Sequence, residues 1–383
     1  MTRHAPQRMP DATLALVVVG LALAGVVFAG SARAFRDAAG GSLPVGVVRS
    51  LVHLAAGMLV MGLAMIVDYR RLVRRTVVWP LLLGTCAALV AVLFMPEVAN
   101  THRFMRIGGF SIQPSEFAKP VLVLVLAAAL VRAGGEIRTR AGLSRPLLLG
   151  GLLAGLVLAG RDLGTPALMF GATLALVFAA GARWRDIGGL VGAGSALFAL
   201  FTWLESYRLE RVRDYLAGLS WDVADLRSFP EGLYQLKQSY LALGAGGLWG
   251  RGLGSSTQKA FFLPEPDNDF IFAVIGEEAG LLGTLAVLAG FLLLAWRGFA
   301  IARHAPDAAG RFVALGATLL LAGQALCHMA VVTGLLPTKG LPLPFLSTGG
   351  SSLVASCALA GLLLNVSLHT RRQPADEQEA LDA

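Results

Sequence analysis

The sequence predicts an all-α protein that crosses a membrane about ten times, and three observations carry this prediction. Of the 383 residues, 56% are hydrophobic and only 15% are charged, whereas soluble domains carry about 25% charged residues. About ten apolar runs approach the roughly 20 residues that a helix needs to cross a ~30 Å hydrocarbon core. Basic residues recur in alternate connecting loops, as the positive-inside rule requires. This composition excludes a disordered chain and a water-soluble globule.

The apolar runs follow one another along the chain and share low charge and a tolerance of glycine and proline. They cover residues 13–29, 47–67, 77–95, 115–132, 146–159, 165–180, 187–204, 270–296, 312–333 and 351–369. Arg3 and Arg8 before the first run, and Ala32-Arg33-Ala34 after it, are also typical of a cleavable signal peptide. The run is longer than the ~7–15 residues of a signal core, so we expect a retained span.

Orientation follows from the basic loops. With a cytoplasmic N-terminus, the inner loops collect the arginines and the short outer loops stay poor in charge. The inner set is Arg70, Arg71, Arg74, Arg75, Arg132, Arg138, Arg140, Arg145, Arg183, Arg185, Arg297, Arg303, Arg311, Arg371 and Arg372. Both termini are therefore predicted to be cytoplasmic, and the net charge of +8 requires no nucleic acid.

One transmembrane domain is predicted over 1–383, with a long extracytoplasmic loop at about 205–269 and a short cytoplasmic tail at 370–383. The cysteines, Cys86, Cys327 and Cys357, all lie inside apolar runs. They provide neither a disulfide framework nor the ligand spacing of a zinc site.

Two polar clusters open predicted outer helix ends. In the first, Ser115 is a candidate N-cap, and Glu116 and Lys119 are i,i+3 neighbours that can pair. In the second, Asp162 and Thr165 lie one turn apart at the start of a span. Each cluster has two interpretations, a capped and neutralised helix end or charges that line a site.

Two further clusters lie nearer the C-terminus. Asp269 stands where an aqueous loop meets an apolar helix, so partial burial would raise its pKa toward that of a general base; helix capping is the alternative. Glu277 and Glu278 lie about two turns deeper, where carboxylates are costly unless paired. Residues 336–352 predict irregular backbone at membrane depth, which requires burial or a cavity. Its amides and hydroxyls suit an anion, although a hairpin loop before the last span is the alternative.

Four cations, Arg49, Arg103, Lys119 and Lys339, are predicted to meet these carboxylates at the outer face. Such a set suits a phosphate-bearing lipid, because cations hold phosphate and a carboxylate handles a proton. Snorkelling is the alternative for each cation taken separately. The glycine-rich stretch 244–254 has no preceding strand and no following Gly-Lys-Ser/Thr, so it predicts no nucleotide site.

The chain resembles the SEDS family in motifs that follow the family's order over nearly its whole length. They are Gln113 to Lys119, Asp162-Leu163-Gly164-Thr165, Tyr234 to Ser239, Gly252 to Lys259, Leu263 to Glu278 and Gly334 to Leu353. Within the family, Gln258-Lys259 and Leu335 to Gly340 resemble the division branch more than the elongation branch.

The resemblance implies a peptidoglycan glycosyltransferase that polymerises lipid II at the outer face of the cytoplasmic membrane and releases undecaprenyl diphosphate. The acidic residue of the family's loop motif falls on Asp269, which is thereby assigned the catalytic role. The resemblance assigns substrate binding to Arg49, Arg103, Glu116, Lys119, Asp162, Thr165, Lys339, Ser351 and Ser352. It implies no fixed cofactor, with a divalent cation (Mg²⁺ or Mn²⁺) as a candidate aid to the leaving diphosphate. The implied partners are a class B penicillin-binding protein, which is a transpeptidase, and the divisome regulators.

The chain departs from the family pattern at four places. Asp267-Asn268 replaces the usual His-Thr or His-Asn, Arg161 a proline, Thr348 a frequent tyrosine and Phe104 a frequent tryptophan. None of these changes removes the proposed base. The alternatives are an elongation polymerase, a lipid II flippase and a scaffold that recruits the transpeptidase. A transporter predicts charges in both membrane halves or internal repeats, whereas these charges gather at one face.

Overall fold

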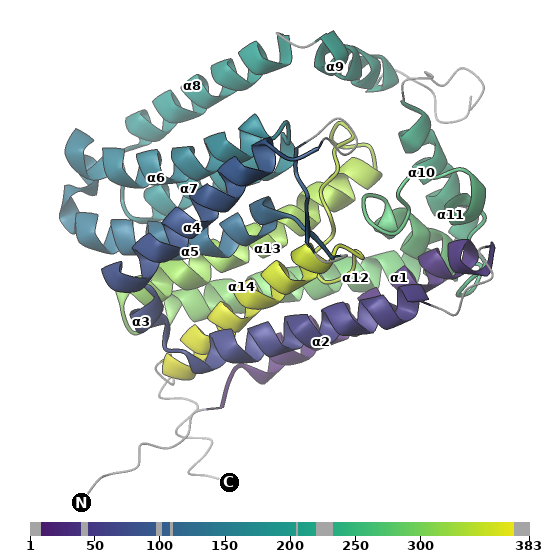
Figure 1. Cartoon of the computed structure of the whole chain (residues 1–383), viewed down its shortest axis with the longest axis horizontal. Helices are drawn as coiled ribbons and strands as arrows, with labels where there is room; N and C mark the ends of the chain where they lie inside the picture. Colours follow the sequence, from purple (N-terminus) through teal and green to yellow (C-terminus); the bar gives the residue numbers. More distant parts are fainter. Residues whose placement is uncertain are drawn as a thin grey trace, which may run out of the picture.

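The computed structural model describes residues 9–39, 45–96, 102–107, 110–203, 206–219 and 233–370. It is an all-helical bundle with one short hairpin (Figure 1). The predicted tail at 370–383 lies outside the described residues except for Thr370, as do positions 205 and 220–232 of the predicted long loop.

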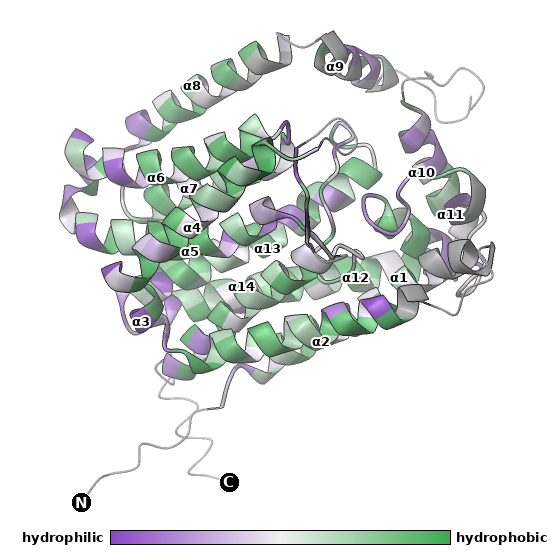
Figure 2. Cartoon of the chain, in the orientation of Figure 1, coloured by the Kyte–Doolittle hydropathy of each residue, from purple (hydrophilic) through white to green (hydrophobic). Residues whose placement is uncertain are grey.

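Eight helices in the described part of the chain are long and apolar enough to cross a membrane. They are α1 (Ala12–Ala39), α2 (Val45–Ile66), α4 (Arg75–Leu93), α5 (Pro114–Ala133), α6 (Arg140–Ala159), α12 (Ile271–Arg303), α13 (Ala308–Val332) and α14 (Gly350–His369). Their surfaces are apolar along the helices and polar mainly at the ends and in the connecting loops (Figure 2). The predicted polytopic helical fold is confirmed.

The two remaining predicted spans, 165–180 and 187–204, coincide with α7 (Gly164–Ala179) and α8 (Trp184–Trp203). Helix α7 is apolar but has only 16 residues, about 24 Å of helix. Helix α8 carries Arg185 and Asp186 in its first turn and lies along the outside of the bundle (Figure 1). All ten predicted runs are therefore helices, and eight of them are long and apolar enough to be candidate membrane spans.

Helices α5, α13 and α14 form the centre of the bundle, where 72%, 67% and 78% of their most apolar windows are buried. Helix α2 is mostly exposed but approaches α14 closely at two glycines. A Cβ at Gly57 would meet Cys357 Sγ at 3.0 Å, and one at Gly361 would meet Met61 O at 2.5 Å. Small residues at such crossings let membrane helices pack by close backbone approach.

The first and last helices meet at one end of the bundle, as an even number of spans requires. The backbone N–H of Asp11 donates to Ser367 Oγ at 3.1 Å, and Arg297 of α12 pairs with Asp11. Buried Leu14 and Val18 place α1 in the core, as expected for a retained span.

The polar connections carry the shorter elements. They are α3 (Tyr69–Leu72), the antiparallel strands β1 (Met105–Ile107) and β2 (Phe110–Ile112), the 3₁₀ turn η1 (Gly134–Arg138), α9 (Ser206–Leu219), α10 (Tyr234–Gly246) and α11 (Gln258–Phe261). The β1–β2 hairpin leads directly into α5, so it fixes the entry to the first polar cluster. The predicted long loop is largely helical where it is described.

Helix α12 is broken at Gly280, whose φ of 68° lies in the left-handed region. At this break Leu281 N–H donates to Gly247 O at 2.9 Å, and Arg251 N–H donates to Glu277 O at 2.9 Å. The segment after the break, 281–303, is about 34 Å long at 1.5 Å per residue, which is by itself enough to cross a ~30 Å hydrocarbon core. The predicted span 270–296 starts where α12 starts and lies within the candidate span Ile271–Arg303, whereas the break at Gly280 was not predicted.

Candidate functional site

Asp269 lies in a tight turn just before α12. The amides of Asn268 and Asp269 donate to Glu265 O at 3.2 and 3.1 Å, and Glu265 has a left-handed φ of 48°. Asn268 Nδ2 donates to Asp269 Oδ1 at 3.1 Å. Non-glycine residues rarely adopt positive φ, and they concentrate at functional sites. This turn therefore holds the carboxylate at the entrance to the helix instead of using it to cap the helix.

The electrostatic surroundings make the Asp269 carboxyl a weaker acid than usual. Burial raises its pKa from 3.8 to about 6, the neighbouring Arg103 opposes this rise, and three nearby carboxylates add to it. Of these carboxylates, Glu265 raises the pKa of Asp269 most, followed by Asp162 and Asp267. A carboxylate with a pKa near 6 is poised to take a proton at neutral pH.

The loop between α13 and α14 closes over Asp269. A Cβ built on Gly340 would lie 2.7 Å from Asp269 Oδ2, so the loop backbone contacts the carboxylate directly. Lys339 precedes this glycine, and burial lowers its pKa while the charge of Asp162 opposes the change. Asp162 thus lies near both Asp269 and Lys339, although it is distant from them in the sequence.

Hydrogen bonds join this loop to the Asp269 turn. Thr348 donates through its backbone N–H to Asp267 O at 3.0 Å and through Oγ1 to Asp267 Oδ2 at 2.9 Å. Ser347 Oγ donates to Asn268 O at 2.8 Å. The residues that depart from the family pattern, Asp267 and Thr348, therefore pair with each other.

Asp162 adopts the capping geometry that was one of its two interpretations. Its Oδ1 accepts from the backbone N–H groups of Gly164 and Thr165 at 3.0 and 3.3 Å, and its Oδ2 accepts from Thr165 Oγ1 at 2.8 Å. Arg161 before it has a left-handed φ of 64°. Capping and proximity to the site coexist, because the same carboxylate acts electrostatically on Asp269 and Lys339.

Glu116 and Lys119 form the predicted ion pair at 2.7 Å, with exposures of 0% and 2%. Lys119 Nζ also donates to Gln324 Oε1 at 2.5 Å, and Gln324 Nε2 donates to Pro342 O at 2.7 Å. Through Gln324, Lys119 supports the loop that carries Lys339, and its role in substrate binding stays a prediction.

Gln324 and His328 of α13 are site residues that the sequence reasoning missed. They are buried and lie one turn apart. Both contact the backbone of the loop before α14, since Gln324 Nε2 donates to Pro342 O and His328 Nδ1 is 2.6 Å from Leu341 O. The signal was present in the sequence. Two polar side chains with i,i+4 spacing inside an apolar run need partners in the membrane.

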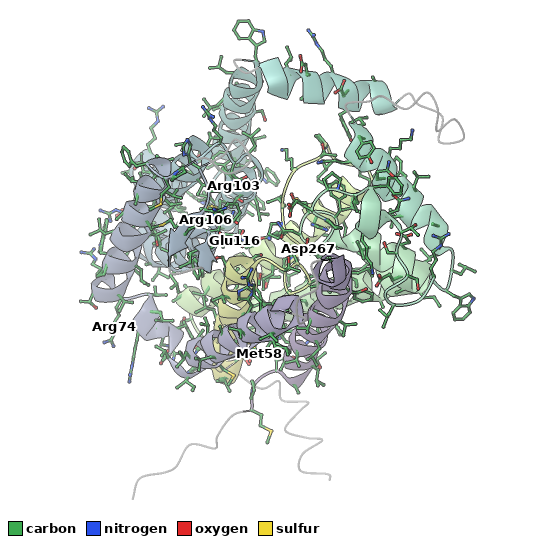
Figure 3. The ribbon with its side chains drawn as sticks, turned by 45° about the vertical axis from the view of Figure 1, so that its right-hand side comes forward. Met58, Arg74, Arg103, Arg106, Glu116 and Asp267 are labelled. Atoms are coloured by element: carbon green, nitrogen blue, oxygen red, sulfur yellow. The ribbon has the colours of Figure 1, made fainter. Side chains whose placement is uncertain are left out.

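The two predicted arginines, Arg103 and Arg49, lie in different places. Arg103 is partly buried and lines, with Ser115 and Asp162, a small pocket of about 10 Å³ whose other walls are mainly apolar. Figure 3 shows Arg103, Glu116 and Asp267 in the same central region, while Arg74 lies at the edge of the bundle. Arg49 is exposed in the first turn of α2, and no contact among the described residues brings it to Asp269.

The two predicted serines open α14. Ser351 Oγ accepts from Gln113 N–H at 3.0 Å, which ties α14 to the entry of α5. Ser352 Oγ is buried and has no hydrogen-bond partner within the described residues. Glu116 Oε1 is likewise buried and unsatisfied. Buried polar groups without partners carry a desolvation cost, and the predicted role of Ser352 and Glu116 in substrate binding stays a prediction.

Glu277 and Glu278 both have partners, as expected for carboxylates inside an apolar helix. Glu277 accepts from Ser256 Oγ at 2.5 Å and from Thr257 N–H at 2.9 Å. Glu278 pairs with buried Lys259. These bonds anchor the segment before Asp269 to the first half of α12, so they position the candidate base without touching it.

A protein-held metal does not fit this donor set. The described residues contain no group of three or more His, Cys, Asp or Glu side chains placed to hold a metal ion. Asp162 and Asp267 are moreover committed to hydrogen bonds. A divalent cation that arrives with a diphosphate would belong to the substrate, and that expectation stays a prediction.

Comparisons with known proteins agree on one family. The family described as cell cycle protein, FtsW/RodA/SpoVE, matches residues 11–372. A probable peptidoglycan glycosyltransferase FtsW of Geobacter sp. (strain M18) is 40% identical over 330 residues, which cover 84% of this chain and 87% of the relative. Stage V sporulation protein E of Bacillus subtilis (strain 168) is 38% identical over 330 residues, with the same coverage of 84% and 87%.

Two solved structures share the fold. A chain from a peptidoglycan synthase complex, in which polymerization and crosslinking are coordinated, superposes with a TM-score of 0.75 at 29% identity over 94% of this chain and 97% of its own. The rod shape determining protein RodA of Thermus thermophilus superposes with a TM-score of 0.66 at 29% identity over 94% and 96%. The chain therefore belongs to the FtsW/RodA/SpoVE family.

Proposed function

We propose that this protein is a peptidoglycan glycosyltransferase that polymerises lipid II, with Asp269 as general base. The observation that carries the proposal is the position of Asp269, a carboxylate with a pKa of about 6 close to Arg103 and to the Lys339–Gly340 backbone. Relatives at about 40% identity bear the name peptidoglycan glycosyltransferase FtsW. The resemblance and the site chemistry thus point to one activity.

The proposed mechanism uses few groups. The incoming sugar hydroxyl attacks the anomeric carbon of the lipid-linked strand, the bond to the diphosphate breaks, and Asp269 accepts the hydroxyl proton. Arg103 and Lys339 stabilise the negative charge that develops on the leaving diphosphate. The unsatisfied Ser352 hydroxyl at the start of α14 supplies a further donor. Lys119, which is buried in its ion pair, holds this arrangement in place.

The cellular role follows from the branch that the chain resembles. FtsW is the name borne by several relatives, so we place this polymerase in septal cell-wall synthesis during division. A complex that coordinates polymerization with crosslinking shares the fold, which favours a crosslinking partner. We identify this partner as a class B penicillin-binding protein, joined by divisome regulators.

We further propose that Asp269 faces the periplasm. The apolar helices establish an integral membrane protein, and the arginine-rich loops lie at the end opposite to Asp269. The positive-inside rule assigns those loops to the cytoplasm. At that end Asp307 accepts from Tyr69 Oη and Arg70 Nε, both at 2.8 Å. This contact joins α3 to the N-cap residue of α13.

The test is lipid II polymerisation by the full-length protein with its transpeptidase, comparing wild type with Asp269→Asn. General base catalysis contributes about 10²–10⁴-fold, so the variant should lose at least about 100-fold in rate. Asp186→Asn makes the same chemical change in α8 and should leave the rate unaltered. Near wild-type polymerisation by Asp269→Asn would exclude the catalytic assignment. Parallel reactions with a chelator, and with Mg²⁺ or Mn²⁺ restored, test the divalent cation.

A further inference from the structure

A groove of about 560 Å³ lies between α12 and α13 at the end opposite to Asp269, outside the candidate site. One wall comes from a single face of α12, because Trp296, Phe299 and Arg303 follow i, i+3, i+7 spacing. The other wall comes from Arg311 and Leu315 of α13, which are one turn apart. The groove is open to the surroundings along its length.

The two arginines of this groove are available for a ligand. Neither the Arg303 nor the Arg311 side chain makes a hydrogen bond or an ion pair within the described residues, and both residues are exposed. Arginines nearby are already engaged, since Arg297 pairs with Asp11 and Arg70 pairs with Asp307. The groove thus has two uncompensated positive charges at one end.

The groove also has a depth profile that matches a phospholipid. Arg303 ends α12 and Arg311 lies in the first turn of α13, at the helix ends that the positive-inside rule assigns to the cytoplasmic surface. Trp296 is seven residues deeper, about 10 Å along the helix, and is 60% exposed. Apolar Phe299, Ala302 and Leu315 line the wall beside and beneath the arginines.

We propose that this groove binds an anionic phospholipid of the adjacent leaflet. The headgroup phosphate is held by Arg303 and Arg311, and an acyl chain lies along Phe299 and Leu315. Guanidinium groups bind phosphate through paired hydrogen bonds, and basic pockets between membrane helices on the cytoplasmic side take anionic headgroups. The proposal is independent of the polymerase activity, since no groove residue belongs to the site around Asp269.

The test measures lipid retention by the full-length protein without its transpeptidase, using native mass spectrometry. The protein is equilibrated with phosphatidylglycerol or with phosphatidylcholine, and the variant is Arg303→Gln/Arg311→Gln. Each basic residue near an anionic surface contributes about a five-fold preference. The phosphatidylglycerol preference should therefore fall roughly 25-fold, whereas Arg303→Lys/Arg311→Lys should retain most of it.

Arg183→Gln/Arg185→Gln is the matched control, because it removes two charges at the same end of the bundle without touching the groove. It should keep the wild-type preference. Equal retention of phosphatidylglycerol by Arg303→Gln/Arg311→Gln and wild type would overturn the proposal. So would loss of transpeptidase binding by this variant with lipid retention intact, since the groove would then hold a partner helix. Competition by undecaprenyl phosphate but not by phosphatidylglycerol would assign the groove to the substrate lipid instead.

Discussion

The Cα of Gly340 lies so close to the carboxylate of Asp269 that a Cβ at position 340 would be 2.7 Å from Oδ2. The two residues are 71 positions apart in the sequence, and their contact brings the loop before α14 onto the turn before α12. A glycine is required here because any side chain would occupy the space of the candidate base.

Gly340→Ala should therefore displace Asp269 and slow lipid II polymerisation by about 100-fold, the cost of a misplacement of about 1 Å. The measurement is the polymerisation rate of the folded, full-length variant with its transpeptidase. Gly84→Ala is the control, because a Cβ at Gly84 meets nothing within 4 Å. Wild-type activity of Gly340→Ala would mean that catalysis does not depend on the placement of the Asp269 carboxylate against Gly340.

The pH dependence of the rate should report the Asp269 carboxyl. Its pKa of about 6 predicts that polymerisation rises as pH increases through about 6 and then levels off, since the ionised form is the base. Glu265→Gln should shift the midpoint downward, because the Glu265 charge helps to raise the pKa. A rate that is constant between pH 5 and pH 8 would contradict this role.

Asp269→Asn should stabilise the protein at pH 8 while it abolishes activity. The folded-state pKa lies above the ordinary value of 3.8, so folding favours the protonated form. Stability therefore falls as pH rises from about 4 to 6, and the full penalty persists above that window. A shift of about two units corresponds to at most about 3 kcal/mol. Thermal unfolding at pH 8 and pH 4 should show a gain only at pH 8; destabilisation at both would disprove the buried-acid assignment.

Lys119→Met should destabilise the protein by about 3–5 kcal/mol, because it leaves Glu116 as an unpaired buried charge. Glu116→Gln/Lys119→Met should recover most of this loss, since neither charge then remains. Thermal unfolding of the single and double variants provides the comparison. A double variant no more stable than Lys119→Met would show that the ion pair is not what the single change disrupts.

Much of the bundle was accessible from sequence because apolar runs and arginine-rich loops are long, repeated signals. The break in α12 was not, since Gly280 resembles the other glycines that membrane helices tolerate. Its left-handed φ depends on partners at 247–252 that no local pattern reveals. A break of this kind is a tertiary property.

The candidate site was predictable in part for a similar reason. Asp269, Asp162 and Lys339 stand out as charges beside apolar runs, and the structure brings them together. The second partner of Lys119, Gln324, was not predictable, because it comes from a helix 205 residues away in the chain. The capping function of Asp162 was visible locally, whereas its influence on Asp269 required the folded arrangement.

The interruption of α12 separates catalysis from the mechanics of the bilayer. A continuous rod of 33 residues would pass every change of tilt or membrane thickness from its spanning half to the carboxylate at its tip. Gly280 and the backbone hydrogen bonds beside it instead tie the short first half of α12 to residues 247–252, which directly follow α10. Hydrophobic mismatch can thus be absorbed by the span from 281 onward, while Asp269 keeps its distance to Gly340.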